Sequence, residues 1–225
     1  MWNKFNIKTF PAETIVYCDG VYNSSLSTIK ETENISKNYD LPIHIVYVGE
    51  IKDKNTLNIN INASNQPVFL SVNIKNKFPA FFNIFIKNTG KNSELRGHIM
   101  CKNLSNLSLN IVAEHNCDDT SILLQTKIIG GKKSYSDVSG LAIVNKNCNN
   151  TKSNISFGGY TIDNTAKIIF KPSQHIMSVP EFADHSAYIF HSDTQIDNYM
   201  RLAGLSGVEV KNALVEAFTN DFNLF

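Results

Sequence analysis

Apolar and polar residues alternate along much of the chain between residues 41 and 170. The alternation is strict over residues 56–62 and holds for most of residues 107–112. Because successive side chains of a β-strand point to opposite faces, this pattern predicts half-buried strands. Further short strands are predicted over residues 15–22 (a strand, a turn and a second strand), 41–48, 68–74, 81–86, 122–129, 141–144 and 166–170.

The segments between these strands are short and rich in Asn, Gly, Ser and Lys. They leave no room for long helices, which argues against βαβ units and a doubly wound sheet. Many short strands in series are typical of a sandwich, a barrel or a solenoid. The runs recur at intervals compatible with the coils of a β-helix, and Asn suits its corners because it tolerates the left-handed conformation. Asn also suits hairpin turns, so the pattern alone leaves all three architectures open.

The pattern changes to helical spacing near the C-terminus. Ser192 or Asp193 is a candidate N-cap for a first helix, and its apolar positions are Ile196, Tyr199, Met200 and Ala203 before a stop at Gly204. Ser206 and Glu209 have the spacing of a capping box for a second helix. The apolar stripe of that second helix contains Val210, Ala213, Leu214, Ala217 and Phe218. We expect two short helices, of which one or both pack on the β body.

Composition excludes several classes of function. The formal net charge of +1 gives no broad attraction to nucleic acid or to an anionic membrane. No window approaches a membrane span, and the N-terminus lacks the pattern of a signal peptide, so we expect a cytoplasmic protein. The four cysteines form no C-x-x-C pair, which argues against a zinc site.

No motif predicts a catalytic site. Asp184, His185 and Ser186 are adjacent, and neighbours on a strand point to opposite faces, so they cannot form a hydrolase triad. Residues 130–134 (Gly-Gly-Lys-Lys-Ser) lack the spacing and the following helix of a phosphate loop, and we interpret them as a turn. Acidic pairs are sparse: Glu31 with Glu33, and Asp118 with Asp119, all in expected loops. On this evidence a structural role explains His185 better than a functional one.

The second half of the chain nevertheless resembles a known family. Residues 139–144 (Ser-Gly-Leu-Ala-Ile-Val) are similar to a short Gly-x-Ile-x-Val strand, and residues 163–172 to a segment in which a strand leads to a Pro. His185 to Ile189 stands at a His-Gly-Ala-Thr-Val motif, and Asp193, Tyr199, Met200, Arg201, Gly204 and Leu205 follow in step with the helix and turn after it. Residues 15–20 with Leu26 and Ser27 match an N-terminal strand and turn. Taken in order, these segments resemble the SufB/SufD family of scaffold proteins for iron–sulfur cluster assembly, and most closely its SufD branch.

The resemblance implies a mainly β protein. Its fold would be a parallel β-helix core over residues 41–191, preceded by a short N-terminal segment (1–40) and followed by an α-helical hairpin (192–225). It implies a scaffold rather than an enzyme, paired with a SufB-like protein and docked to a SufC-like ATPase through Tyr199, Met200, Arg201, Gly204 and Leu205. His185 would stand at the position of the cluster-assembly His and could ligate iron through a neutral imidazole nitrogen. We expect no tightly bound cofactor, but an iron ion or iron–sulfur cluster shared transiently with the SufB-like partner.

Three alternatives accompany this interpretation. Pairing could join two copies of this chain as a homodimer. The protein could be a carbohydrate-active enzyme, because parallel β-helices often host polysaccharide lyases or hydrolases; such a site would need clustered acids or a basic dyad on one face of the solenoid. It could also be a degenerate family member with a purely structural role.

Overall fold

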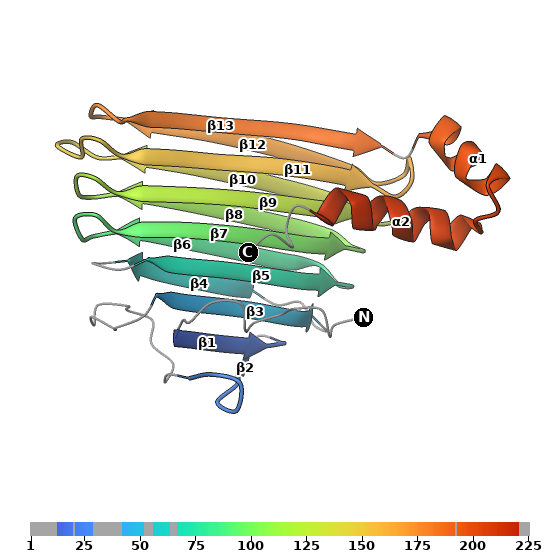
Figure 1. Cartoon of the computed structure of the whole chain (residues 1–225), viewed down its shortest axis with the longest axis horizontal. Coiled ribbons are helices and arrows are strands. Elements are labelled where there is room, and N and C mark those ends of the chain that lie inside the picture. The colour runs from blue at the N-terminus through green and yellow to red at the C-terminus, as the bar shows by residue number, and fades with distance from the viewer. Residues whose placement is uncertain are drawn as a thin grey trace.

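The computed structural model describes residues 13–19, 21–28, 42–51, 56–63, 67–191 and 193–220. Strands dominate these residues (Figure 1). They are β1 (Glu13–Cys18), β2 (Val21–Tyr22), β3 (Ile43–Ile51), β4 (Thr56–Ala63), β5 (Val68–Asn76), β6 (Ala80–Asn88), β7 (Glu94–Asn103), β8 (Asn106–His115), β9 (Ser121–Gly130), β10 (Tyr135–Val144), β11 (Lys152–Thr161), β12 (Lys167–Ile176) and β13 (Phe182–His191). Two helices follow, α1 (Thr194–Leu202) and α2 (Gly207–Thr219).

The strands form two sheets, and from β3 onward the chain enters them alternately. Sheet A has the order β13-β11-β9-β7-β5-β3-β1-β2, and sheet B has the order β12-β10-β8-β6-β4. Apart from the antiparallel pair of β1 and β2, each strand pairs in parallel with the strand two places along the chain. The protein is therefore a parallel β-solenoid in which one sheet A strand and the following sheet B strand make one coil (Figure 1). The expectation of a mainly β chain with a parallel β-helix core and two short C-terminal helices is confirmed, and the sandwich and the barrel are excluded.

Alternation produces the core. In β5 and β6 every second residue is buried, and in-register pairing stacks these residues into columns that run the length of the solenoid. Such columns need complementary sizes. Gly140 of β10 lies under the ring of Phe157 of β11, where an added Cβ would come within 2.5 Å of the ring. Phe157 in turn stacks on Phe170 of β12, the strand that follows it in the chain, with 5.3 Å between ring centroids.

Asparagine lines the corners of the coils, as the sequence predicts. Asn92, Asp119 and Asn150 each adopt a positive φ at the turn between a sheet B strand and the next sheet A strand. At another corner Asn76 and Asn103 are buried on successive coils. Asn side chains therefore satisfy both the backbone conformation and the polar groups of the tightest parts of the solenoid.

Both helices begin as predicted. Asp193 caps α1, with its side chain accepting a hydrogen bond from the amide of Gln195. Ser206 and Glu209 form the capping box of α2. Among the described residues, no helix is long and apolar enough to cross a membrane.

Three strands, β7, β11 and β13, are absent from the set that alternation predicts. The turn expected at residues 130–134 is observed: Gly130 ends β9, and the Ser134 side chain donates to the Gly131 carbonyl. Residues 24–26 form a turn, and the acidic pair of Glu31 and Glu33 lies outside the described residues.

Candidate functional site

Within the described residues, the solenoid ends at β12 and β13, which no further coil covers. β12 and β13 are the edge strands of sheet B and sheet A, and both lie at the top of the stack in Figure 1. Almost every residue of β13 is exposed, whereas in β11, its neighbour in sheet A, at least every second residue is buried. We call this surface, formed by the uncovered sides of β12 and β13, the open end.

The open end exposes apolar side chains and the outer edges of two strands. An edge strand presents one row of N–H and C=O groups without a ladder partner, and such an edge is a template for pairing with another chain. Large hydrophobic side chains are exposed on this coil and the loop within it: Ile176, Met177, Val179, Phe182, Tyr188, Ile189 and Phe190. Isolated exposed apolar residues are ordinary, but a group of this size on one coil is a candidate interaction surface.

His185 lies on the open end and faces the axis of the solenoid. Its register partner in β11 is Ile155, a core residue, and paired residues of a parallel sheet point to the same side. His185 therefore continues an interior column, yet it is exposed because no coil lies above it. Its backbone N–H donates to the Asp184 carboxylate, 2.8 Å away. Within the part of the chain that the structure describes, no hydrogen bond engages the imidazole, which is exposed toward a molecule that approaches the open end.

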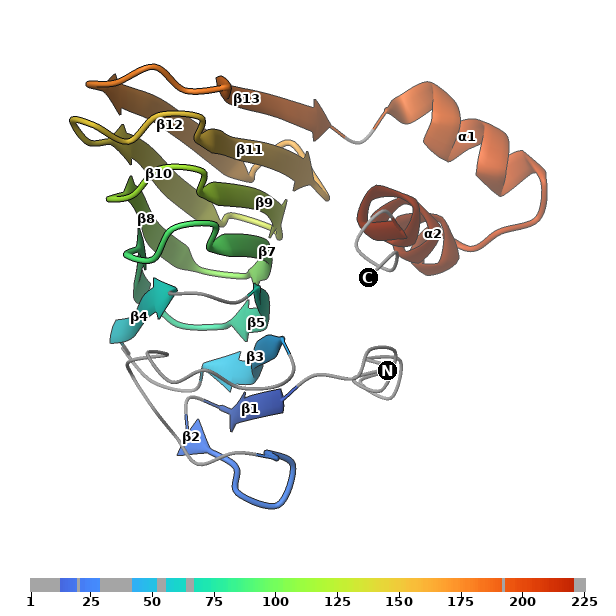
Figure 2. The same ribbon diagram turned by 60° about the vertical axis from the view of Figure 1, so that its left-hand side comes forward.

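The second exposed surface is on α1. This helix has no buried residue, although its apolar and polar residues lie on separate faces. Its apolar face contains Ile196, Tyr199 and Leu202, and Tyr199 and Leu202 are 75% and 89% exposed. Figure 2 shows both helices on the sheet A side of the solenoid, with α1 farther from the strands than α2. A helix with an uncovered apolar face has the form of a docking element.

The predicted docking residues lie together on α1 and the turn that follows it. Arg201 donates to the Asp197 carboxylate one helical turn earlier, at 2.7 Å. Gly204 has φ +97° and ends the helix, and the Leu205 amide donates to the Met200 carbonyl. Among the described residues, no hydrogen bond or ion pair joins this group to His185, so the structure contains two separate candidate surfaces rather than one site.

In contrast to α1, α2 is packed on the outer face of sheet A. Val210 is fully buried, and the ring of Phe218 lies 5.7 Å from that of Tyr160 on β11 and 6.4 Å from that of Phe190 on β13. The ammonium group of Lys127 on β9 donates to the Phe218 carbonyl at 2.6 Å. Sequence reasoning missed Lys127, because a Lys at an outward position of a strand is ordinarily solvated.

The described residues do not make a self-contained metal site. They contain no group of three or more His, Cys, Asp or Glu side chains able to hold a metal ion. Burial raises the pKa of the Cys101 thiol to about 12, and burial, followed by the nearby Cys117 and Asp118, raises that of Cys148. Because the thiolate is the metal ligand, these two cysteines are poor ligands, and His185 would need further ligands from a partner.

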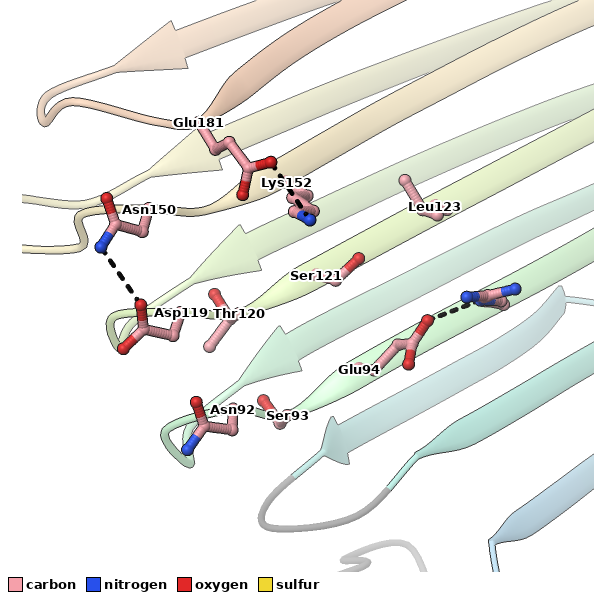
Figure 3. Close-up of a pocket in the computed structure, with 11 residues that line it drawn as sticks. Asn92, Ser93, Glu94, Asp119, Thr120, Ser121, Leu123, Asn150, Lys152 and Glu181 are labelled. Atoms are coloured by element: carbon pink, nitrogen blue, oxygen red, sulfur yellow. Dashed lines mark hydrogen bonds and ion pairs between the residues drawn. The ribbon is translucent and has the colours of Figure 1, made fainter.

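A polar trough runs across the corner at the start of β7, β9 and β11, with a volume of about 660 Å³ (Figure 3). It contains the three carboxylates of Glu94, Asp119 and Glu181. Each already has a partner: Arg96 for Glu94, Lys91 and the Asn150 amide for Asp119, and Lys152 for Glu181. Carboxylates that act in glycoside hydrolysis face each other across the substrate, whereas these are engaged in ion pairs along the surface.

No family model matches this chain, and no curated protein matches it.

Proposed function

We propose that this protein is a non-enzymatic scaffold subunit that pairs through the open end of its solenoid and docks an ATPase through its C-terminal helices, as the SufB/SufD family does. The observation that carries the proposal is the uncovered terminal coil, with two long edge strands and exposed apolar side chains. A second observation is consistent with it: α1 has no buried residue and exposes the apolar side chains of Ile196, Tyr199 and Leu202. The described residues thus leave two separate surfaces uncovered, which is what a scaffold between two different proteins requires.

The open end suits a SufB-like partner that also presents an edge of a β-helix. Pairing of edges satisfies backbone groups on both chains and buries the apolar residues of β12 and β13. A second copy of this chain would present the same surface, so the same chemistry permits a homodimer. The uncovered face of α1 suits a groove on a SufC-like ATPase, with Tyr199 as the aromatic anchor.

Co-purification with a SufB-like and a SufC-like protein tests the proposal. Ala187→Lys places a charge at an interior-facing position of the open end, and we expect it to abolish pairing with the SufB-like protein but not binding of the SufC-like ATPase. Tyr199→Ala combined with Leu202→Ser should have the converse effect. Phe81→Ser is the matched control, because Phe81 is exposed on the outer face of sheet B, away from both surfaces. Failure of the unmodified chain to associate with either protein would overturn the proposal.

His185 has a narrower role within it. Facing the axis at the interface, its imidazole would orient or ligate iron, or a cluster forming on a ligand of the SufB-like partner; the iron–sulfur cluster is cargo here rather than a resident cofactor. We expect His185→Ala to preserve assembly of the complex and to lower the yield of cluster. His191→Ala is the control, since His191 lies on the same strand but bonds to Thr161. Unchanged cluster formation by the His185→Ala complex would remove this role.

A further inference from the structure

We infer that Lys127 of the solenoid is the C-terminal cap of α2, and that it holds the helical hairpin to the outer face of sheet A as a reversible latch. Lys127 is the largest fully buried side chain of the described residues, with 1% exposure. Its neighbours in the sheet register, Met100 on β7 and Gly158 on β11, share its outward face. A lysine at such a position is buried only because another element covers it, and that element is α2.

Two contacts of the ammonium group come from the last turn of α2. Its Nζ donates to the Phe218 carbonyl at 2.6 Å and lies 5.0 Å from the centroid of the Phe218 ring. The final carbonyls of a helix have no partners within the helix and carry the negative end of its dipole. A basic residue in the last turn usually meets this need, and α2 has none. Lys127 supplies the missing cation from a strand 91 positions earlier in the chain.

The same contacts make the latch reversible. The docked hairpin gains the hydrogen bond, the cation–π contact and the packing of Phe218 against Tyr160 and Phe190. Docking also costs free energy, because the ammonium group of Lys127 loses its hydration; that hydration is regained when α2 detaches from sheet A. Because these contributions oppose each other, α2 can detach locally from sheet A while the in-register solenoid stays folded. The pKa of the nearby His98 is lowered, mainly because the imidazole is buried and in addition because Lys127 is positively charged.

Opening of the latch would uncover Lys127 and the aromatic surface of Tyr160 and would release both helices together. The inference rests on contacts within the chain and holds whether or not the hairpin docks an ATPase. Under the proposed function it also means that the scaffold can present α1 in two positions relative to the open end.

Lysine labelling of the full-length chain tests, without any substitution, whether α2 covers Lys127. With an amine-reactive acetylating reagent at low conversion and mass-spectrometric readout, we expect Lys127 to react at least about tenfold more slowly than the exposed Lys171. Val210→Asp places a charge at the buried position of α2 and should raise the Lys127 rate to near that of Lys171. Equal rates for Lys127 and Lys171 in the unmodified protein would overturn the inference.

Hydrogen exchange separates the cap from simple burial. Lys127→Met keeps the length of the side chain but removes the donor and the charge, and we expect amides of α2 to exchange about tenfold faster while those of β7, β9 and β11 are unchanged. Lys171→Met, on β12 and away from the contact between Lys127 and α2, is the matched control. If Lys127→Met leaves exchange in α2 as it is in the unmodified protein, Lys127 is buried by α2 but does not hold it.

Discussion

The side-chain amide of Asn76 donates to the side-chain oxygen of Asn103 one coil further along, at 2.8 Å, and both residues are fully buried. Asn103 also accepts from the amide of Ser105 and donates to the Tyr135 carbonyl and the Ser136 hydroxyl. One side chain thus uses its acceptor and its donors to join three successive coils. A buried polar group that is completely satisfied fixes the register of its neighbours.

Asn103→Asp tests this connection with almost no change of shape. A carboxylate cannot donate to the Tyr135 carbonyl, and protonating it or burying its charge both cost free energy. We expect the free energy of unfolding to fall by about 3 kcal/mol, measured by denaturant titration. Asn83→Asp is the control, because Asn83 donates to Asn58 on the outer face of sheet B; its effect should be below about 1 kcal/mol. Equal losses in the two variants would contradict the role given to Asn103.

The buried His115 predicts sensitivity to acid. The Thr120 hydroxyl donates to the Cys117 carbonyl, so at 2.7 Å it must accept from Nδ1–H of His115, which leaves Nε2 buried without a partner. Burial lowers the pKa of His115 from 6.5 to about 4. The unfolded chain therefore binds the proton first as the pH falls, and stability should decrease between pH 6.5 and 4 by about 3 kcal/mol.

His115→Gln removes this titration and should flatten the dependence of unfolding free energy on pH over that range. A residual slope is expected, because burial also lowers the pKa values of His44 and His98. Urea titrations at several pH values between 7 and 4 provide the measurement. The explanation fails if the variant and the unmodified protein lose stability in parallel.

The contact between Gly140 and Phe157 predicts a penalty for added volume. In Gly140→Ala the new methyl group would lie 2.5 Å from the ring of Phe157, which is held between this glycine and Phe170. We expect a loss of about 2 kcal/mol from overpacking. The double variant Gly140→Ala with Phe157→Leu should recover part of this loss relative to Phe157→Leu alone, and a double-mutant cycle measures the coupling. Simple additivity of the two substitutions would show that the ring adjusts without strain.

The capping box of α2 predicts a local effect. The Ser206 hydroxyl accepts from the Glu209 amide, and the Glu209 carboxylate accepts from the Ser206 amide. Ser206→Ala removes one half of this exchange and should destabilise α2 by about 1 kcal/mol. Hydrogen exchange in the first turn of α2 should accelerate accordingly. Ser206→Asp keeps an acceptor at the cap and should restore most of the protection; acceleration in both variants would instead point to a steric requirement for Ser.

Alternation in the sequence was sufficient to predict a β-rich chain because the outward positions of most strands are polar. It failed for β11 because one of the inward residues, Ser153, is polar, so Ser153, Ile155 and Phe157 do not form the apolar series that predicts a strand. It failed for β7 because Gly97 occupies a core column in which Leu124 fills the space that a side chain would need. These compensations are made between coils, and they depend on residues about 30 positions apart.

The helix caps were predicted from local sequence because the residues that make them are within three positions of one another. The packing of α2 over Lys127 was not predicted, because Lys127 and its partner Phe218 are 91 positions apart in the chain. The open end could not be recognised from the sequence either. The exposure of β13 follows from the absence of a covering coil on the described chain, while its composition is that of an ordinary strand.

Because the coils stack in uniform register, the length of the solenoid is set by the number of coils. Each coil advances the stack by the spacing of neighbouring strands, about 4.8 Å. Loss or duplication of a whole coil between β3 and β7 would move the β1–β2 end by that increment and leave Lys127, α2 and the terminal strands in place. A solenoid of this kind with more or fewer coils would therefore keep the open end and the helices in place while changing how far the β1–β2 end reaches.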